Sequence, residues 1–242
     1  DLIRRATGQP PKFPQEERRY LVEAIRFVSR VSLVEEDLTG FPSNLSGLAV
    51  DEADDTPARR AFCAARGLAY HVFTSADLAG FPEEAEVRRQ AAGGIPTPPD
   101  HRVTPSPCHP VTLSPRHPVT PSPRHPVTPS PCHRVIVTGC YDWLHSGHVR
   151  FFEEASTYGD LIVVVGNDAN VRHLKGEGHP LQTQEERRYM VGAIRYVRQA
   201  LISTGWGWLD AESEIRRLKP DIYLVNDDGD RPEKREFCAQ HG

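Results

Sequence analysis

The chain has 242 residues, which suits one or two domains that can each bury a core. Charged residues make up 26% of the chain and the formal net charge is −4, so no basic excess indicates a nucleic-acid-binding protein. The sequence has neither an apolar run of about 20 residues nor a cleavable signal peptide, so we expect a cytoplasmic protein with no membrane partner. Its five cysteines include no Cys-x-x-Cys pair, which argues against a disulfide framework or a zinc ribbon and predicts reduced thiols.

Residues 1–90 resemble part of the C-terminal end of the chain. QEERRYLVEAIRFV (15–28) matches QEERRYMVGAIRYV (184–197), and PARRAFCAARG (57–67) matches PEKREFCAQHG (232–242). The first copy begins near the equivalent of Asn170 and has Ala53 where the second copy has Asp228. We therefore predict that residues 1–90 are a partial, degenerate α/β repeat that does not catalyse a reaction alone. Either it is a structural element that packs elsewhere, or it is a regulatory or dimer-like partner of the second copy.

Residues 91–133 are rich in proline, and an eight-residue unit of the type HPVTPSPR recurs from His101 to Cys132. Proline at this density blocks helices and sheet ladders and favours a solvated, extended chain. We predict a disordered linker. Metal binding by its histidines and cysteines, or modification of its Ser-Pro and Thr-Pro pairs, are the alternatives.

Residues 134–150 predict a strand, a turn and a helix. The β-branched run from Val135 to Val137 ends at a glycine turn, and apolar residues at helical spacing follow. The first turn of a helix offers unpaired N–H groups and the positive end of the helix dipole, which together bind phosphate. Gly147 lets a phosphate approach the backbone, and His145 and His148 can donate hydrogen bonds to its oxygens. Two histidines three residues apart can also be metal ligands or ordinary surface groups.

The rest of the C-terminal region alternates between strands and helices. LIVVVG (161–166) predicts a buried strand, and Thr183 and Glu186 predict a capping box for a helix from about Gln184. Met190, Ile194, Val197 and Leu201 are expected along one face of that helix. Asp210 is expected to cap a helix that stops before Pro220, and residues 221–225 predict a strand. This alternation indicates a parallel sheet whose first strand ends at the phosphate-binding turn.

The segment Gly139-Cys140-Tyr141-Asp142-x-x-His145-x-Gly147-His148 resembles the G-x-[FY]-D-x-x-H-x-G-H signature of the cytidylyltransferase-like nucleotidyltransferases. The resemblance covers residues 134–242. It implies an α/β fold, a Rossmann-like parallel sheet with helices on both faces (the nucleotidyltransferase fold). It also implies transfer of a nucleoside monophosphate to a small phosphorylated acceptor with release of pyrophosphate. The nucleotide would be CTP, which is the commoner substrate in the family, and CMP would be the group transferred.

The resemblance also implies roles for single residues. His145, His148 and Lys175 would be catalytic, the histidines stabilising the transition state and Lys175 holding triphosphate oxygens. The nucleotide-binding residues would be Gly139, Tyr141, Asp142, Gly147, Arg187 and Asp228. A structural ion pair is the alternative for Arg187, and a cap or turn is the alternative for both aspartates. Mg²⁺ is expected as cofactor, with CTP or ATP as substrate and without a dedicated set of protein ligands.

One part of the family's pattern is missing. The family has an arginine and a serine/threonine-rich segment after the last matched helix, whereas this sequence stops at Gly242, so we expect a C-terminally truncated domain. A non-catalytic nucleotide-binding or scaffold protein built from degenerate and truncated copies is therefore the competing hypothesis. The apolar face shared by both copies of the repeated helix predicts pairing of the copies, within one chain or in a homodimer.

Overall fold

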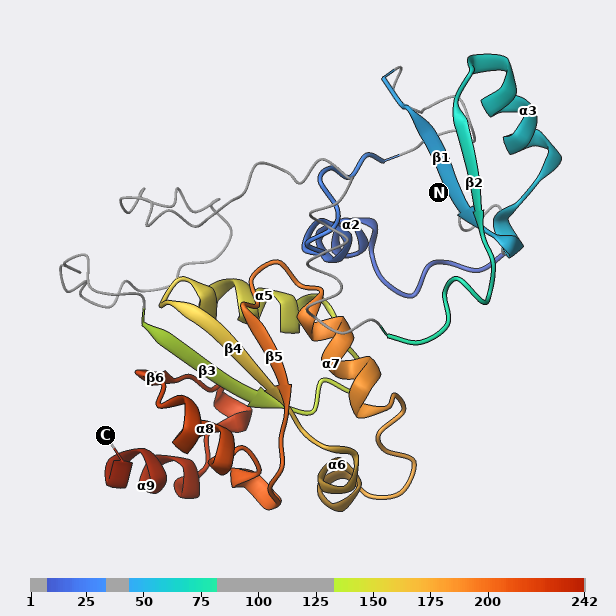
Figure 1. Cartoon of the computed structure of the whole chain (residues 1–242). Coiled ribbons are helices and arrows are strands. Elements are labelled where there is room, and N and C mark those ends of the chain that lie inside the picture. The colour runs from blue at the N-terminus through green and yellow to red at the C-terminus, as the bar shows by residue number, and fades with distance from the viewer. Residues whose placement is uncertain (1–7, 34–43, 82–132, 242) are drawn as a thin grey trace. The chain divides into compact units, whose positions relative to one another are not determined.

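The computed structural model describes residues 8–33, 44–81 and 133–241 (Figure 1). The chain divides into two compact units, Asp1–Glu83 and Glu84–Gly242. Apart from His133, the predicted linker at 91–133 lies outside the described residues. Within the described ranges, no helix is both long enough and apolar enough to cross a membrane.

The first unit contains a short parallel βαβ arrangement. Strands β1 and β2 pair in parallel, and the helix α3 lies between them in the chain. Thr56 caps the start of α3 by accepting from Arg59 N–H, and Gly67 ends it with a left-handed conformation (φ 63°), which glycine adopts without strain. The elements of this unit are α2 (Gln15–Glu23), β1 (Gly47–Asp51), η1 (Glu52–Asp54), α3 (Pro57–Arg66) and β2 (Ala69–Phe73).

The second unit is built on a four-stranded parallel sheet. Its strands are β3 (Arg134–Gly139), β4 (Asp160–Val165), β5 (Gln199–Ile202) and β6 (Ile222–Tyr223), in the order β5-β4-β3-β6. The predicted α/β class and parallel sheet are confirmed. The other elements are α5 (Ser146–Ser156), α6 (Asp168–Lys175), α7 (Gln184–Gly192), η2 (Gly207–Leu209), α8 (Glu212–Leu218), η3 (Asp227–Gly229) and α9 (Pro232–His241).

Helices cover both faces of this sheet. Figure 1 shows α5 and α7 on one side of the strands and α8 and α9 on the other. Because successive side chains of a strand point to opposite faces, β3 and β4 supply both layers of the core. Ile136, Ile162 and Val164 pack with Ala211, Ile215 and Phe237 of the α8 and α9 layer. Their neighbours in the strands, including Val135, Val137 and Val163, are fully buried as well.

The two matching sequence segments adopt the same local structure. Helices α2 and α7 start at aligned glutamines and are both nine residues long, and their C-cap residues Ala24 and Ala193 have the same backbone angles (φ −76°, ψ −12°). A short 3-10 helix precedes α3 and α9 at the same offset. The match therefore extends from residue types to helix lengths and end geometry.

The long helix that we expected from Gln184 to Leu201 is wrong in its extent. The predicted capping box is present, because Thr183 Oγ1 accepts from Glu186 N–H and the Glu186 carboxylate accepts from Thr183 N–H. The helix nevertheless ends at Gly192, and Leu201 belongs to strand β5. Glycine is a poor helix former, and the turn after it buries Ile194 and Val197 to 1% and 2% exposure before the chain enters the sheet. The apolar residues 194, 197 and 201 therefore have the spacing of a helix face, but they lie in a turn and a strand.

Two smaller expectations also change. Asp210 does not cap α8: the N-cap is Ala211, and the Asp210 carboxylate instead accepts a hydrogen bond from Ser203 Oγ at 2.7 Å. The strand expected at residues 221–225 is shorter, since β6 covers only Ile222–Tyr223. The amide of Leu224 still donates to the Ile136 carbonyl, so the chain stays beside β3 beyond the end of the strand.

Candidate active site

The two predicted histidines build the start of helix α5. His145 is the N-cap residue, and its Nδ1 accepts a hydrogen bond from Gly147 N–H at 3.1 Å. His148 Nδ1 in turn accepts from His145 N–H at 3.4 Å, which completes a capping box made of two imidazoles. The ring centroids lie 3.9 Å apart. The sequence predicts a phosphate site at these residues. In the structure they also accept hydrogen bonds from backbone amides that would otherwise lack a partner at the start of the helix.

These contacts determine where each ring carries its proton. A ring nitrogen that accepts a hydrogen bond from a backbone amide has no proton of its own, so in both rings the remaining proton lies on Nε2. Burial lowers the pKa of His148 to about 4, helped by the neighbouring His145 and Lys175 and opposed by Asp228. His148 is therefore a neutral Nε2–H donor at pH 7.

Two predicted residues pack behind the histidines. Tyr141 is 6% exposed, and its ring lies 5.4 Å from the His148 ring and 5.2 Å from that of Phe152. Gly139 makes room for it, because a Cβ at that position would lie 2.8 Å from the Tyr141 ring. At Gly147 a Cβ would lie 2.9 Å from His145 Cε1. Both glycines are thus required by close packing of the turn at residues 139–148, hereafter the phosphate turn.

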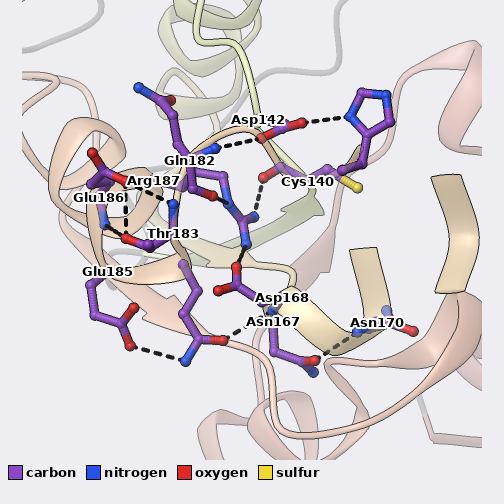
Figure 2. Close-up of polar contacts among 12 residues, drawn as sticks. Cys140, Asp142, Asn167, Asp168, Asn170, Gln182, Thr183, Glu185, Glu186 and Arg187 are labelled. Carbon is purple, nitrogen blue, oxygen red and sulfur yellow. Dashed lines mark hydrogen bonds and ion pairs between the residues drawn. The ribbon is translucent and has the colours of Figure 1, made fainter. Parts of the chain in front are cut away.

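Asp142 connects the phosphate turn to the segment at residues 179–182. Its carboxylate accepts from Leu181 N–H at 2.6 Å and Gln182 N–H at 3.2 Å, and it lies 2.8 Å from His179 Nδ1 (Figure 2). Burial raises the pKa of Asp142, but these hydrogen bonds outweigh burial and leave the pKa below its usual value. The predicted nucleotide-binding role of Asp142 stays a prediction, and its observed contacts fix one loop against another.

Arg187 is fully buried and bonds three separate parts of the unit. Its guanidinium donates to the Gln182 carbonyl at 3.1 Å, to the Cys140 carbonyl at 2.5 Å and to the Asp168 carboxylate at 2.7 Å (Figure 2). With 0% exposure, the side chain offers no surface to a nucleotide in this conformation. These contacts include the structural ion pair that was the alternative and hold the backbone of the phosphate turn, and the nucleotide-binding role of Arg187 stays a prediction.

Lys175 and Asp228 come from different elements and lie near His148. Lys175 is the exposed last residue of α6, and Asp228 is an exposed residue of η3, after the last strand. The charges of both act on the pKa of His148, in opposite directions. The structure therefore brings His145, His148, Lys175 and Asp228 to one region at the carboxyl end of β3, where ligands bind in open parallel sheets. It places Tyr141 and Arg187 behind that region.

Comparison with known proteins agrees with this arrangement of strand, phosphate turn and helix. Residues 136–235 match the profile of the family described as Cytidylyltransferase-like. These residues form a cytidylyltransferase-like domain. The matched range begins in β3 and ends in α9, so it contains every residue of the candidate site and all of the four-stranded sheet except the first two residues of β3.

The cytidylyltransferase-like domain has relatives with two kinds of name. It is 38% identical over 89 residues to FAD synthase from Archaeoglobus fulgidus, a match that covers 36% of this chain and 61% of the relative. It is 41% identical over 92 residues to the Bifunctional protein HldE from Aliarcobacter butzleri, covering 36% of this chain and 18% of the relative. The chain thus spans about three fifths of the first relative and under a fifth of the second. A solved structure, the lipopolysaccharide core biosynthesis protein from Thermoplasma volcanium, is 25% identical with a TM-score of 0.40 and covers 46% of this chain and 86% of that chain.

The donor set of the domain fits a metal that arrives with its substrate. In the ranges that the structure describes, no three His, Cys, Asp or Glu residues are grouped so that they could hold a metal ion. Asp228 is the exposed carboxylate close to His148. Mg²⁺ needs only one or two carboxylates when phosphates and water complete its coordination, so Asp228 is the residue that would hold it.

Sequence reasoning missed three residues of this region. His179 and Asp168 hold Asp142 and Arg187, and Lys234 reaches Thr138 at the end of β3. His179 and Asp168 carry no signal of their own, because their partners are distant in sequence. Lys234 lies in the repeated segment at 232–242, and its exchange for Arg59 in the first copy was a visible signal.

Proposed function

We propose that the cytidylyltransferase-like domain transfers a nucleoside monophosphate from a nucleoside triphosphate to the phosphate of a small acceptor and releases pyrophosphate. The observation that carries this proposal is the pair of imidazoles at the start of α5, each with its Nδ1 occupied by a backbone amide and its Nε2–H free to donate. The family match at residues 136–235 supports the reaction class.

The chemistry needs little covalent participation from the protein. An oxygen of the acceptor phosphate attacks the α-phosphorus, a new P–O bond forms, and the bond between the α-phosphorus and the bridging oxygen breaks as pyrophosphate leaves. Positioning and stabilisation of negative charge therefore supply most of the rate. His145 and His148 would donate from Nε2 to the α-phosphate oxygens, where charge accumulates in the transition state.

Lys175 and Asp228 would complete the site. Lys175, exposed at the end of α6, supplies a compact cation for the β- and γ-phosphates. Asp228 would orient the ribose or hold Mg²⁺ through one oxygen. Mg²⁺, when bound to the triphosphate, would neutralise part of its charge. Arg187 and Asp142 act at a distance, because they fix the turn that bears the histidines.

The nucleotide and acceptor define the arms of the experiment. The family description favours CTP, with phosphorylated alcohols and sugars as acceptors. The similarity to proteins named FAD synthase makes ATP with FMN the second pair to test.

The test measures pyrophosphate release with Mg²⁺ for both nucleotides, in the presence and absence of each acceptor. The intact chain is compared with His148→Ala and with His133→Ala, whose side chain lies at the opposite end of β3 and is 44% exposed. We expect release that requires one acceptor, persists in His133→Ala and is lost in His148→Ala. A folded protein that binds nucleotide but releases no pyrophosphate with any pair would establish the non-catalytic alternative.

A further inference from the structure

A buried lysine lies beside the candidate active site without an ion-pair partner. Lys234 of α9 is 8% exposed, and its Nζ donates one long hydrogen bond, 3.4 Å, to Thr138 Oγ1. Its Nζ also lies 5.5 Å from the centre of the Tyr223 ring. None of the ion pairs among the described residues includes Lys234. An ammonium has three donors, so at least two of them lack a strong acceptor.

The surrounding carboxylates do not supply the missing hydrogen-bond acceptors of the Lys234 ammonium. Burial lowers the pKa of Lys234, and the charges of Asp210, Asp228 and Asp230 only partly oppose that effect. Asp230 forms a bidentate pair with Arg235, and Asp210 accepts from Ser203. A buried cation with so little compensation lowers stability, and such a feature is kept where a ligand supplies the missing charge.

A second cation, Arg231, lies near Lys234. The guanidinium carbon of Arg231 lies 4.1 Å above the Trp208 ring, and its Nε is buried without a hydrogen bond. Arg231 is close enough to Lys234 that its charge contributes to lowering the pKa of the lysine. Two neighbouring cations repel each other unless an anion lies between them. The hydroxyls of Thr138 and Tyr223 are hydrogen-bonded to each other at 2.8 Å, so one of the two keeps an O–H that can donate at this position.

In the first copy of the repeat, the cation at the position of Lys234 has a carboxylate partner within the protein. Arg59 aligns with Lys234, and it forms an ion pair with Asp54 at 3.0 Å. Asp54 aligns with Gly229, so the second copy lacks the carboxylate that would pair with Lys234. Thr56, which caps α3 in the first copy, aligns with the cation Arg231. Compared with the first copy, the second copy therefore lacks an internal acceptor and has a second cation.

We infer that Lys234 and Arg231 form a subsite for a phosphate dianion, and that this phosphate is the nucleophilic phosphomonoester of the acceptor. The two cations alone support the binding of a phosphate. The identification of that phosphate as part of the acceptor rests on the proposed function. Thr138 immediately precedes Gly139 of the phosphate turn, and Asp228 acts on both His148 and Lys234, so the subsite is continuous with the candidate active site. An acceptor held here would present its phosphate beside the histidines.

The test uses the full chain and inorganic phosphate as the probe. Lys234→Met removes the charge and keeps the length of the side chain, and Arg235→Met is the matched control, one residue further along α9 and exposed. We expect calorimetry to show phosphate binding weakened at least tenfold in Lys234→Met and unchanged in Arg235→Met. Binding of CTP and ATP should change less than twofold in both variants, and a loss of nucleotide binding in Lys234→Met would assign the subsite to the triphosphate and overturn our inference.

Stability gives an independent readout. Without phosphate, the urea midpoint of Lys234→Met should lie above that of the intact chain, because an unpaired buried charge has been replaced by an apolar side chain. Phosphate should raise the midpoint of the intact chain and leave that of the variant unchanged. A lower midpoint in Lys234→Met, with phosphate binding retained, would make Lys234 a structural residue. Phosphate binding that depends on Lys234 in a protein without transferase activity would support the subsite and refute the proposed reaction.

Discussion

Replacing Arg187 by methionine should destabilise the C-terminal unit more than any other single change in α7. The substitution removes hydrogen bonds to two carbonyls and one carboxylate, and all of these acceptors lose a charged partner. Breaking a buried ion pair by removing one partner costs about 3–5 kcal/mol, and a hydrogen bond to a charged group contributes about 1.5–3 kcal/mol. Asp168 is 33% exposed and can be hydrated, so we expect a loss of about 3–4 kcal/mol in the free energy of unfolding.

The assay is urea unfolding followed by tryptophan fluorescence. The chain has three tryptophans, Trp143, Trp206 and Trp208, so the signal reports only on the C-terminal unit. Arg188→Met is the control within the unit, since it makes the same charge change at the next residue of α7, where the side chain is only partly buried. Arg18→Met is the control for the repeat, because it changes the aligned residue of the first copy and should leave the fluorescence transition unaltered.

The result that refutes this reasoning is specific. If Arg187→Met and Arg188→Met differ by less than about 1 kcal/mol, the three contacts of the buried guanidinium do not hold the fold together. If Arg187→Met is as stable as the intact chain but no longer binds nucleotide, Arg187 is a direct ligand and its burial changes on binding. We expect lower stability together with weaker nucleotide binding, because the Cys140 carbonyl and the phosphate turn lose their support.

Three further predictions concern the phosphate turn. His145→Asn keeps an oxygen that can accept from Gly147 N–H whereas His145→Ala does not, so urea unfolding should show only the alanine variant to be less stable, by about 1 kcal/mol, while pyrophosphate release is lost in both. Gly147→Ala places a Cβ 2.9 Å from His145 Cε1, so we expect the ring to move and pyrophosphate release to fall at least tenfold with an unchanged circular dichroism spectrum; normal release would show that the ring position is not critical. The pKa of His148 is about 4 against an ordinary 6.5, so the unfolded chain binds more protons between these values, and stability is lost as the pH falls from 6.5 towards 4, by at most about 3 kcal/mol before solvent screening. Urea midpoints at pH 4.5, 5.5 and 7 should show this trend in the intact chain and a weaker one in His148→Gln. Between pH 5 and pH 7, kcat/KM should show no loss caused by protonation of His148.

Much of the fold could be predicted because its signals are local. The β-branched runs at 134–139 and 160–165 form the central strands, and the Thr183 and Glu186 capping box lies where their spacing placed it. Caps depend on residues three apart, and strands depend on alternation or on continuous apolar runs, so one sequence is enough. The end of α7 was missed because Ile194, Val197 and Leu201 are buried in a turn and a strand that keep a helix-like spacing.

In the candidate site, too, the local features could be predicted from the sequence and the long-range contacts could not. The sequence alone identified the two histidines, their glycine and the strand before them, and the structure shows them at the start of α5 as a cap. It did not reveal the contacts that decide what Asp142, Arg187 and Lys234 do. Asp142 reaches the amides of residues 181 and 182, Arg187 reaches the Cys140 carbonyl, and Lys234 reaches Thr138.

The sequence by itself therefore determined the strand, turn and helix on which the proposed phosphate chemistry depends, because they are encoded by a local pattern whose ten key residues run from 139 to 148. The tertiary structure decided which charged groups face a ligand and which hold the protein together. Sheet order and register place residues from opposite ends of the unit within hydrogen-bonding distance, and burial then determines whether a charge is paired, as at Arg187, or left for a ligand, as at Lys234. Burial is a property of the packed chain, so no local pattern could supply it.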